Sequence, residues 1–231
     1  MGSAAVETRS LPWEDRLARL GSASHPSLYG LGGAVKRLLD IAGATVGLVC
    51  LFPVLLLVAL AVRWDSPGPV FFRQERVGWN GRRFKILKFR TMVVDAEARR
   101  AELEALNEIP DGPIFKMKDD PRVTRVGRFL RRSSLDEFPQ LINILLGDMS
   151  LVGPRPPLPA EVEDYSDRDL ERLRLMPGAT GAWQVTERRG GTSFREMVEL
   201  DLRYAAEWSV WKDFVILMRT VLLVLRLQGS R

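Results

Sequence analysis

The sequence of 231 residues has one cysteine and one histidine, and each scarcity argues against a class of site. Cys50 has no partner for an internal disulfide and lies in an apolar run, where cysteine behaves as a small hydrophobic residue. With His25 as its one histidine, the chain lacks the ligands of a typical zinc site and the base of a histidine-dependent catalytic triad. A metal ion bound here would therefore have oxygen ligands, and Mg²⁺ is the first candidate.

The charge balance is positive, with 34 basic and 29 acidic residues, a formal charge of +5 and a pI of about 9.7. This balance favours an anionic partner: a phosphorylated ligand, a nucleic acid or an anionic membrane surface. The length fits one domain, or one domain with an attached segment, and no internal repeat is visible.

Charges are absent from residues 41–62, IAGATVGLVCLFPVLLLVALAV. As a straight helix rising about 1.5 Å per residue, this stretch is roughly 33 Å long and could cross a bilayer. Pro53 at its centre removes a backbone hydrogen bond, so the sequence permits two forms: a kinked spanning helix, or a re-entrant helix that enters and leaves on one face. Basic residues flank both ends and leave the orientation open.

Composition divides the chain into three parts. Residues 1–33 are polar and rich in small residues, which predicts a flexible N-terminal tail with one short amphipathic helix in LPWEDRLARL. Residues 34–65 hold the membrane segment, and residues 66–231 form the remaining domain. Within that domain, alternating charges over residues 95–108 predict a surface helix.

Turn signals on either side of short apolar runs predict a β-hairpin soon after the apolar stretch, with Asn80 and Gly81 in its turn. Period-two alternation on the second strand places four side chains on one face: Phe84, Ile86, Lys88 and Arg90. The two cations at the end of this strand could contact a phosphate, or they could simply be solvated.

Two adjacent carboxylates, Asp136 and Glu137, follow a run of basic residues with arginine at every third position from 122 to Arg131. Ser134 stands three residues before Glu137, which is the spacing of a helix capping box and predicts that both acids lie in a first helical turn. There the helix dipole favours the ionised carboxylate. The pair could bind a metal or attack an electrophile, and it could equally belong to an ordinary capped helix.

Two features follow the acidic pair. Prolines on both sides of Arg155 restrict its backbone, which suits a bidentate phosphate contact. The apolar C-terminal segment carries basic residues at steps of seven, which predicts either a helix lying in the membrane interface or a buried amphipathic helix.

Several motifs, in order along the chain, resemble those of bacterial sugar transferases, the monotopic phosphoglycosyl transferases. They are KRLLDIAGATVGLVCLFPVLLL, DSPGPVFFRQERVG, FKILKFRTM, KDDPRVTRVGRFLRRSSLDEFPQLINILLGDMSLVGPRPP and PGATGAWQV. The resemblance runs from Lys36 to the C-terminus. It implies an α+β fold, predominantly helical with a small β-hairpin, in a monotopic membrane protein. Its N-terminal membrane helix would be re-entrant and broken at Pro53, with interfacial amphipathic helices beside it.

The resemblance also implies an activity. Such enzymes use Mg²⁺ to move a sugar-1-phosphate from a UDP-sugar to polyprenyl (undecaprenyl) phosphate in the cytoplasmic leaflet of the bacterial inner membrane, and they release UMP. By motif position, Asp136 is the expected nucleophile and metal contact, and Glu137 assists. The substrate-binding residues implied by the same positions are Lys88, Arg90, Arg131, Arg155 and Asp213. The GAWQV loop favours glucose or galactose, and the oligomeric state stays open, a homodimer included.

Two other classes of protein share some of these features. A non-catalytic membrane scaffold with a basic face would use the apolar stretch and the arginines, but it has no need of Asp136 and Glu137 or of a proline-flanked Arg155. A nucleic-acid-binding protein would use the basic residues but leaves the apolar stretch unexplained. No nucleic-acid partner is therefore expected.

Overall fold

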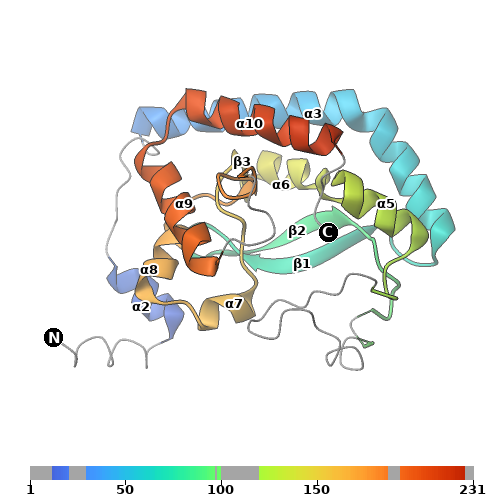
Figure 1. Cartoon of the computed structure of the whole chain (residues 1–231), viewed down its shortest axis with the longest axis horizontal. Helices are drawn as coiled ribbons and strands as arrows, with labels where there is room; N and C mark the ends of the chain where they lie inside the picture. Colours follow the sequence, from blue (N-terminus) through green and yellow to red (C-terminus); the bar gives the residue numbers. More distant parts are fainter. Residues whose placement is uncertain (1–11, 21–29, 97, 100–119, 187–192, 227–231) are drawn as a thin grey trace.

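The structure, a computed structural model, describes residues 12–20, 30–96, 98–99, 120–186 and 193–226 (Figure 1). The α-helices are α2 (Trp13–Arg19), α3 (Gly30–Asp65), α5 (Arg125–Ser133), α6 (Gln140–Leu146), α7 (Pro159–Glu163), α8 (Asp167–Leu170), α9 (Phe194–Ala206) and α10 (Val210–Leu225). The strands are β1 (Phe71–Val77), β2 (Arg83–Phe89), β3 (Ser150–Val152) and β4 (Gly178–Thr180), and the 3-10 helices are η2 (Trp79–Gly81), η4 (Leu135–Glu137) and η5 (Glu171–Arg174). The predicted helix over residues 95–108 lies almost entirely outside the described residues, and its described beginning forms turns.

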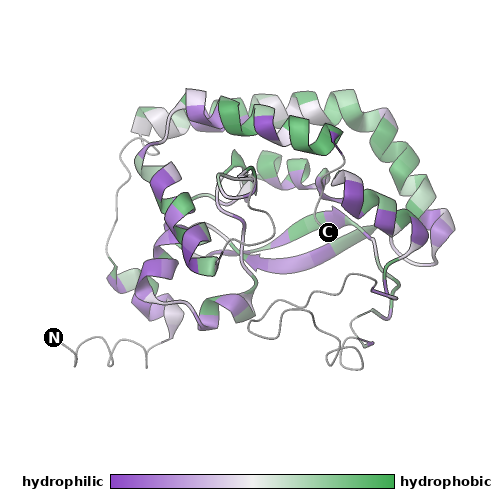
Figure 2. Cartoon of the chain, viewed as in Figure 1, coloured by the Kyte–Doolittle hydropathy of each residue, from purple (hydrophilic) through white to green (hydrophobic). Residues whose placement is uncertain are grey.

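Helix α3 spans 36 residues and carries the predicted apolar stretch. It runs along the top of the molecule and then turns down at its right-hand end, with Pro53 inside it (Figure 1). Proline removes an intrahelical hydrogen bond and clashes with the preceding turn, which accounts for a bend in a continuous helix. Among the described residues, α3 is the one helix long and apolar enough to cross a membrane, and 11% of its most apolar stretch is buried inside the protein (Figure 2).

One stripe of α3 faces the protein body. Lys36, Asp40 and Ala44 are buried at steps of four residues along the first half of the helix. Lys36 Nζ donates to Asp213 Oδ2 over 2.7 Å, and Asp40 Oδ1 accepts from the Leu151 backbone N–H over 2.9 Å. The charges before the apolar stretch therefore dock α3 on the body, while its other faces present exposed apolar side chains.

Strands β1 and β2 form the predicted antiparallel hairpin. Asn80 and Gly81 in its turn both have positive φ, +51° and +79°. Phe84 and Ile86 are buried from one face of β2 in a cluster with Ala44 of α3 and other apolar side chains. The small antiparallel sheet within a mostly helical chain confirms the coarser form of the predicted fold class.

A second, parallel pair of short strands joins β3 to β4, with Ser150 opposite Gly178 and Val152 opposite Thr180. Periodicity does not predict this pair, because its strands are short and far apart in sequence. A Cβ on Gly178 would stand 2.1 Å from the backbone N of Gly153, so the close approach of the two chains requires glycine here. This contact brings the loop of residues 153–157 beside the loop that follows Leu175.

Part of the predicted flexible tail is docked. Trp13 and Leu17 of α2 are buried against the end of β1 and against α8 and η5. Arg16 donates from Nε to Asp167 Oδ1 over 2.9 Å and from Nη2 to the Tyr165 carbonyl over 2.8 Å. The short amphipathic helix is therefore confirmed, while residues 1–11 and 21–29 lie outside the described residues.

The predicted capping box at Ser134 is wrong. Ser134 ends α5 in the left-handed conformation, with φ +57°, and its side chain does not cap the turn that follows. Asp136 and Glu137 lie in the single 3-10 turn η4, and α6 begins separately at Gln140 after Pro139. The arginine run is also interrupted: α5 begins at Arg125 with Thr124 as its cap.

At the C-terminus, α9 lies at the left of the molecule and α10 runs beside α3 along the top (Figure 1). Helix α10 buries Asp213 and Ile216 toward β3 and β4 and exposes large apolar side chains along its outer surface. These exposed side chains are Val210, Trp211, Phe214, Met218, Val221, Leu222 and Leu225.

Candidate active site

The acidic pair lies where α5, η4 and β2 meet. Glu137 is held against β2 by Lys88, whose Nζ lies 2.7 Å from Glu137 Oε1. Both side chains are partly exposed, 23% for Lys88 and 35% for Glu137, so the pair borders solvent. Leu135, at the start of η4, packs against the apolar cluster of α3, β2 and α5 and anchors the turn.

Asp136 has a different environment from its neighbour. Burial and the negative charge of Glu137 raise the pKa of Asp136 from its ordinary 3.8 to about 6, against the opposing pull of Lys88 and Arg131. Among the described residues, no ion pair within 4.0 Å engages the Asp136 carboxylate. Because this pKa lies below 7, the half-buried carboxylate is largely ionised at neutral pH.

Glu137 is stabilised in its ionised form. Burial alone would raise the pKa of Glu137, but the charges of Lys88, Arg155 and Arg76 hold it below the ordinary value. The two carboxylates therefore have opposite pKa shifts, which is the usual sign that adjacent acids have different roles.

Arg76 of β1 is a site residue that the sequence analysis missed. It is buried, and burial together with the positive charge of Arg155 lowers its pKa to about 10. Its guanidinium donates to the Pro156 carbonyl over 3.1 Å and to Gln74 Oε1 over 2.7 Å. The hairpin register could have revealed it, since Arg76 stands directly opposite the buried Phe84.

Arg131 approaches the acids from α5. Its Nε donates to Thr91 Oγ1 over 3.0 Å, and its charge acts on both Asp136 and Asp120. Arg122, which begins the predicted stripe, is buried instead and forms a two-pronged pair with Asp120 over 2.7 and 2.9 Å. Arg131 is thus the arginine of the predicted stripe that lies at the acidic pair.

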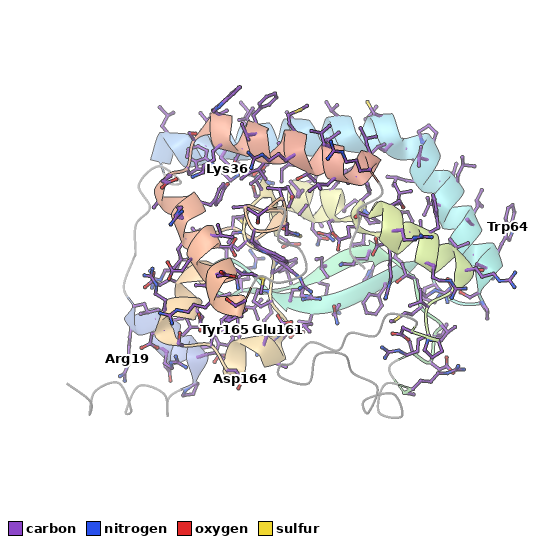
Figure 3. All side chains as sticks on the ribbon, viewed as in Figure 1. Arg19, Lys36, Trp64, Glu161, Asp164 and Tyr165 are labelled. Carbon is purple, nitrogen blue, oxygen red and sulfur yellow. The ribbon has the colours of Figure 1, made fainter. Side chains whose placement is uncertain are left out.

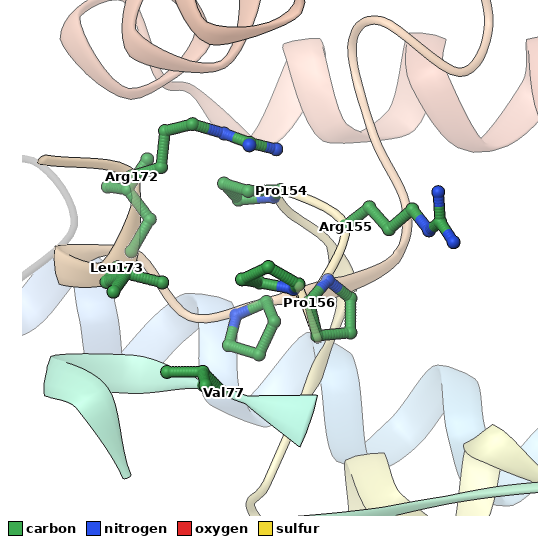
Figure 4. A pocket seen from close by; sticks show the side chains of 10 residues that line it. Val77, Pro154, Arg155, Pro156, Arg172 and Leu173 are labelled. Atoms are coloured by element: carbon green, nitrogen blue, oxygen red, sulfur yellow. The ribbon is translucent and has the colours of Figure 1, made fainter. Parts of the chain in front are cut away.

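The loop of Arg155 is fixed by its neighbours on both sides. The Pro154 carbonyl accepts from the Gly178 N–H over 2.8 Å, and the Pro157 carbonyl accepts from the Val77 N–H over 2.9 Å. The Arg155 side chain extends away from the surrounding prolines (Figure 4). The pocket beneath it has a volume of about 10 Å³, room for roughly one water. The loop therefore presents an exposed cation and does not itself enclose a ligand.

Two predicted substrate-binding residues have other partners. Arg90 is buried and donates to the carbonyls of Ser66 and Pro67 over 2.8 and 2.6 Å, which holds the end of α3 to the hairpin. Asp213 of α10 accepts from Lys36, Tyr204 and Trp208 over 2.7, 2.6 and 3.1 Å. Asp213 thus contacts α3 at the end that holds Lys36, whereas Arg90 contacts the chain just after the opposite end, where Trp64 lies (Figure 3). The structure thus groups Lys88, Arg131 and Arg155 with the acids and gives Arg90 and Asp213 structural contacts.

No group of three or more metal-ligating side chains occurs in the described part of the chain. The donors present are the two adjacent carboxylates, Asp136 and Glu137. They fit Mg²⁺, which commonly takes one or two protein carboxylates and completes its octahedron with substrate phosphates and water. They do not fit an ion held wholly by protein side chains.

A carboxylate beside clustered cations can attack an electrophilic phosphorus, because the cations offset the phosphate charge. Together with the exposed apolar surfaces of α3 and α10, the site is typical of an enzyme that acts on a phosphorylated substrate at an apolar surface. The chain belongs to the bacterial sugar transferase family, whose sequence profile matches residues 31–227.

Individual relatives agree with this assignment. A protein named galactosyl transferase CpsE of Streptococcus agalactiae is 46% identical over 85% of this chain and 43% of its own length. The UDP-glucose:undecaprenyl-phosphate glucose-1-phosphate transferase of Escherichia coli is 45% identical over 84% of the chain and 41% of its length. The exopolysaccharide production protein ExoY of Rhizobium meliloti is 40% identical over 87% of the chain and 89% of its length. The chain thus spans less than half of the first two relatives and most of the third.

Proposed function

We propose that the protein transfers a sugar-1-phosphate from a UDP-sugar to undecaprenyl phosphate, a membrane step of exopolysaccharide or related glycan synthesis. The observation that carries this proposal is the adjacent pair Asp136 and Glu137 in η4, with Lys88 Nζ 2.7 Å from Glu137 Oε1 and the charge of Arg131 acting on Asp136. The names of relatives that act on UDP-glucose, UDP-galactose and undecaprenyl phosphate support the substrate class.

In the proposed reaction, an Asp136 oxygen forms a bond to the sugar-bearing phosphorus of the UDP-sugar. The bond between that phosphorus and the bridging oxygen breaks, and UMP leaves with the electron pair. An oxygen of undecaprenyl phosphate then attacks the same phosphorus and releases Asp136 as a carboxylate. Lys88, Arg131 and Arg155 offset the phosphate charge in both steps, and ionised Glu137 holds Lys88 in place.

Mg²⁺ is part of this proposal, with Asp136 as its protein ligand. When bound, the ion would neutralise phosphate charge and orient the diphosphate. The adjacent carboxylates supply the oxygen donors that Mg²⁺ prefers.

The proposal places α3 in a single leaflet as a re-entrant helix bent at Pro53, with α10 lying in the interface. Large apolar side chains are exposed on α3 both before and after Pro53. The helix also bends along its length (Figure 1), and both features support the proposal. The inward stripe of α3 docks it on the same body at both ends, through Lys36 and through Val62. The site would then face the cytoplasm at the level of the lipid phosphates.

UMP release from a panel of UDP-sugars, with short-chain undecaprenyl phosphate and Mg²⁺, tests the proposal. We expect turnover with UDP-glucose or UDP-galactose, and loss of at least about 10³-fold in Asp136→Asn, because the nucleophile is removed. Asp164→Asn is the matched control. It changes an exposed carboxylate at the C-terminal cap of α7 and should keep turnover. Unchanged turnover in Asp136→Asn would overturn the nucleophile assignment.

A further inference from the structure

Asn143 of α6 is a buried amide that makes all of its side-chain contacts around strand β2 and the end of its own helix. Its Oδ1 accepts from the Leu87 backbone N–H over 2.9 Å, and its Nδ2 donates to the Lys85 carbonyl over 2.9 Å. A longer contact of 3.3 Å joins Nδ2 to Asp148 Oδ2.

These contacts satisfy two backbone groups on the edge of β2 that does not pair with β1. Strand β1 satisfies one edge of β2, and the groups of Lys85 and Leu87 that bond Asn143 belong to the other edge. The amide of Asn143 offers one donor and one acceptor, as a residue of a third strand would. A buried side chain thus replaces strand pairing at this point and fixes α6 relative to β2.

The two elements that Asn143 joins position the two partners of the Lys88–Glu137 ion pair. Lys88 follows Leu87 directly on β2, and Glu137 lies in η4, the turn that leads into α6. A shift of α6 along β2 would therefore change the 2.7 Å contact between Lys88 Nζ and Glu137 Oε1. We infer that Asn143 is a positioning residue for the transfer reaction, which sets the register of Lys88 against the Asp136–Glu137 pair.

This inference rests on the proposed function, since the register matters through the charges at the reacting phosphate. A purely structural role would lower stability without a specific effect on the reaction. Loosening the register instead takes Lys88 from its place beside the acids, so the loss falls on kcat and depends on the presence of Lys88.

The test compares Asn143→Ala with wild type in kcat and KM for UMP release at a single pH. We expect kcat to fall by about tenfold and KM to change by less than about threefold, because a misplaced Lys88 weakens stabilisation of the transition state more than binding of the substrate. Asn143→Asp, which keeps the size and the acceptor but loses the donor to Lys85, serves if the alanine variant does not fold. Ser193→Ala, which removes the cap of α9, is a control that lowers stability and leaves kcat unchanged.

A double-variant experiment separates positioning from general destabilisation. In a Lys88→Met background, Asn143→Ala should lower kcat no further, because its effect acts through Lys88. An unchanged kcat in the single variant, or an equal fall in both backgrounds, would overturn the inference. If the wild type itself releases no UMP, the proposed function fails. A double-variant cycle of the same two changes in the free energy of unfolding then still shows whether Asn143 and Lys88 are coupled.

Discussion

At the scale of single residues, the central feature is that two adjacent carboxylates have opposite environments. Glu137 has Lys88, Arg155 and Arg76 to hold its charge, whereas Asp136 is destabilised by burial and by Glu137 itself. A poorly compensated carboxylate costs folding free energy and gains reactivity toward a cationic or electrophilic ligand. Asp136 is therefore the group for which stability and function conflict.

This conflict predicts the stability of Asp136→Asn. The folded protein holds the proton of Asp136 up to a pH of about 6, above the ordinary 3.8, so stability falls as the pH rises through that window and the full cost remains above it. Removing the charge should stabilise the protein by about 1 to 3 kcal/mol at pH 7.5 and by little at pH 4. Thermal unfolding in detergent at both pH values checks this, and an equal effect at the two would contradict it.

Lys88, Arg131 and Arg155 lie near the acidic pair, and their roles toward a substrate stay predictions of the motif positions. Arg76 was missed because an arginine in a charged strand is normally expected to face solvent. Its burial follows from the hairpin register, which places it opposite the buried Phe84. The burial of Arg90 was likewise hidden, since its partners are backbone carbonyls at the end of α3.

At the scale of elements, local signals predicted well and long-range contacts did not. The hairpin follows from Asn80 and Gly81, whose positive φ values suit the turn. The capping box failed because Ser134 is used to end α5, and a residue in the left-handed conformation cannot also begin a regular helix. The β3–β4 pair depends on the approach of Gly153 to Gly178, which no local pattern reveals.

Helix α2 gives an element-scale prediction. It precedes the family match at residues 31–227, yet Trp13 is only 3% exposed and packs in the cluster that includes Val77 and Leu173. These two residues also line the pocket beneath Arg155. Trp13→Ala should lower stability by about 3 to 5 kcal/mol, as large-to-small core substitutions do.

Thermal unfolding of Trp13→Ala measures this directly. The exposed Arg19→Ala change at the end of the same helix is the matched control and should shift stability by less than about 0.5 kcal/mol. An unaltered melting temperature in Trp13→Ala would show that α2 does not dock in solution.

At the scale of the whole molecule, the exposed apolar residues belong largely to α3 and α10 (Figure 2). Surfaces of this extent are typical of proteins that contact a membrane. Strand β2, which carries Lys88, lies beneath them (Figure 1), and η4 contacts this strand. One molecule thus combines a hydrophobic surface with the site that we propose binds phosphate.

Cysteine labelling tests the proposed topology of α3. In a Cys50→Ala background, cysteines placed at Leu31 and Trp64, which are 84% and 83% exposed at opposite ends of the helix, should both react with a membrane-impermeant reagent from the cytoplasmic side. Inverted vesicles and intact cells provide the two sides of the comparison. Labelling from opposite sides would establish a spanning helix and contradict the re-entrant form.

The most direct test of the central claim is mass spectrometry of the protein after incubation with UDP-glucose or UDP-galactose and Mg²⁺, without the lipid acceptor. We predict one equivalent of UMP and a hexose-phosphate adduct on the peptide that contains Asp136, discharged by added undecaprenyl phosphate and absent in Asp136→Asn. Turnover that requires both substrates together, with no adduct on Asp136 at any stage, would contradict the account.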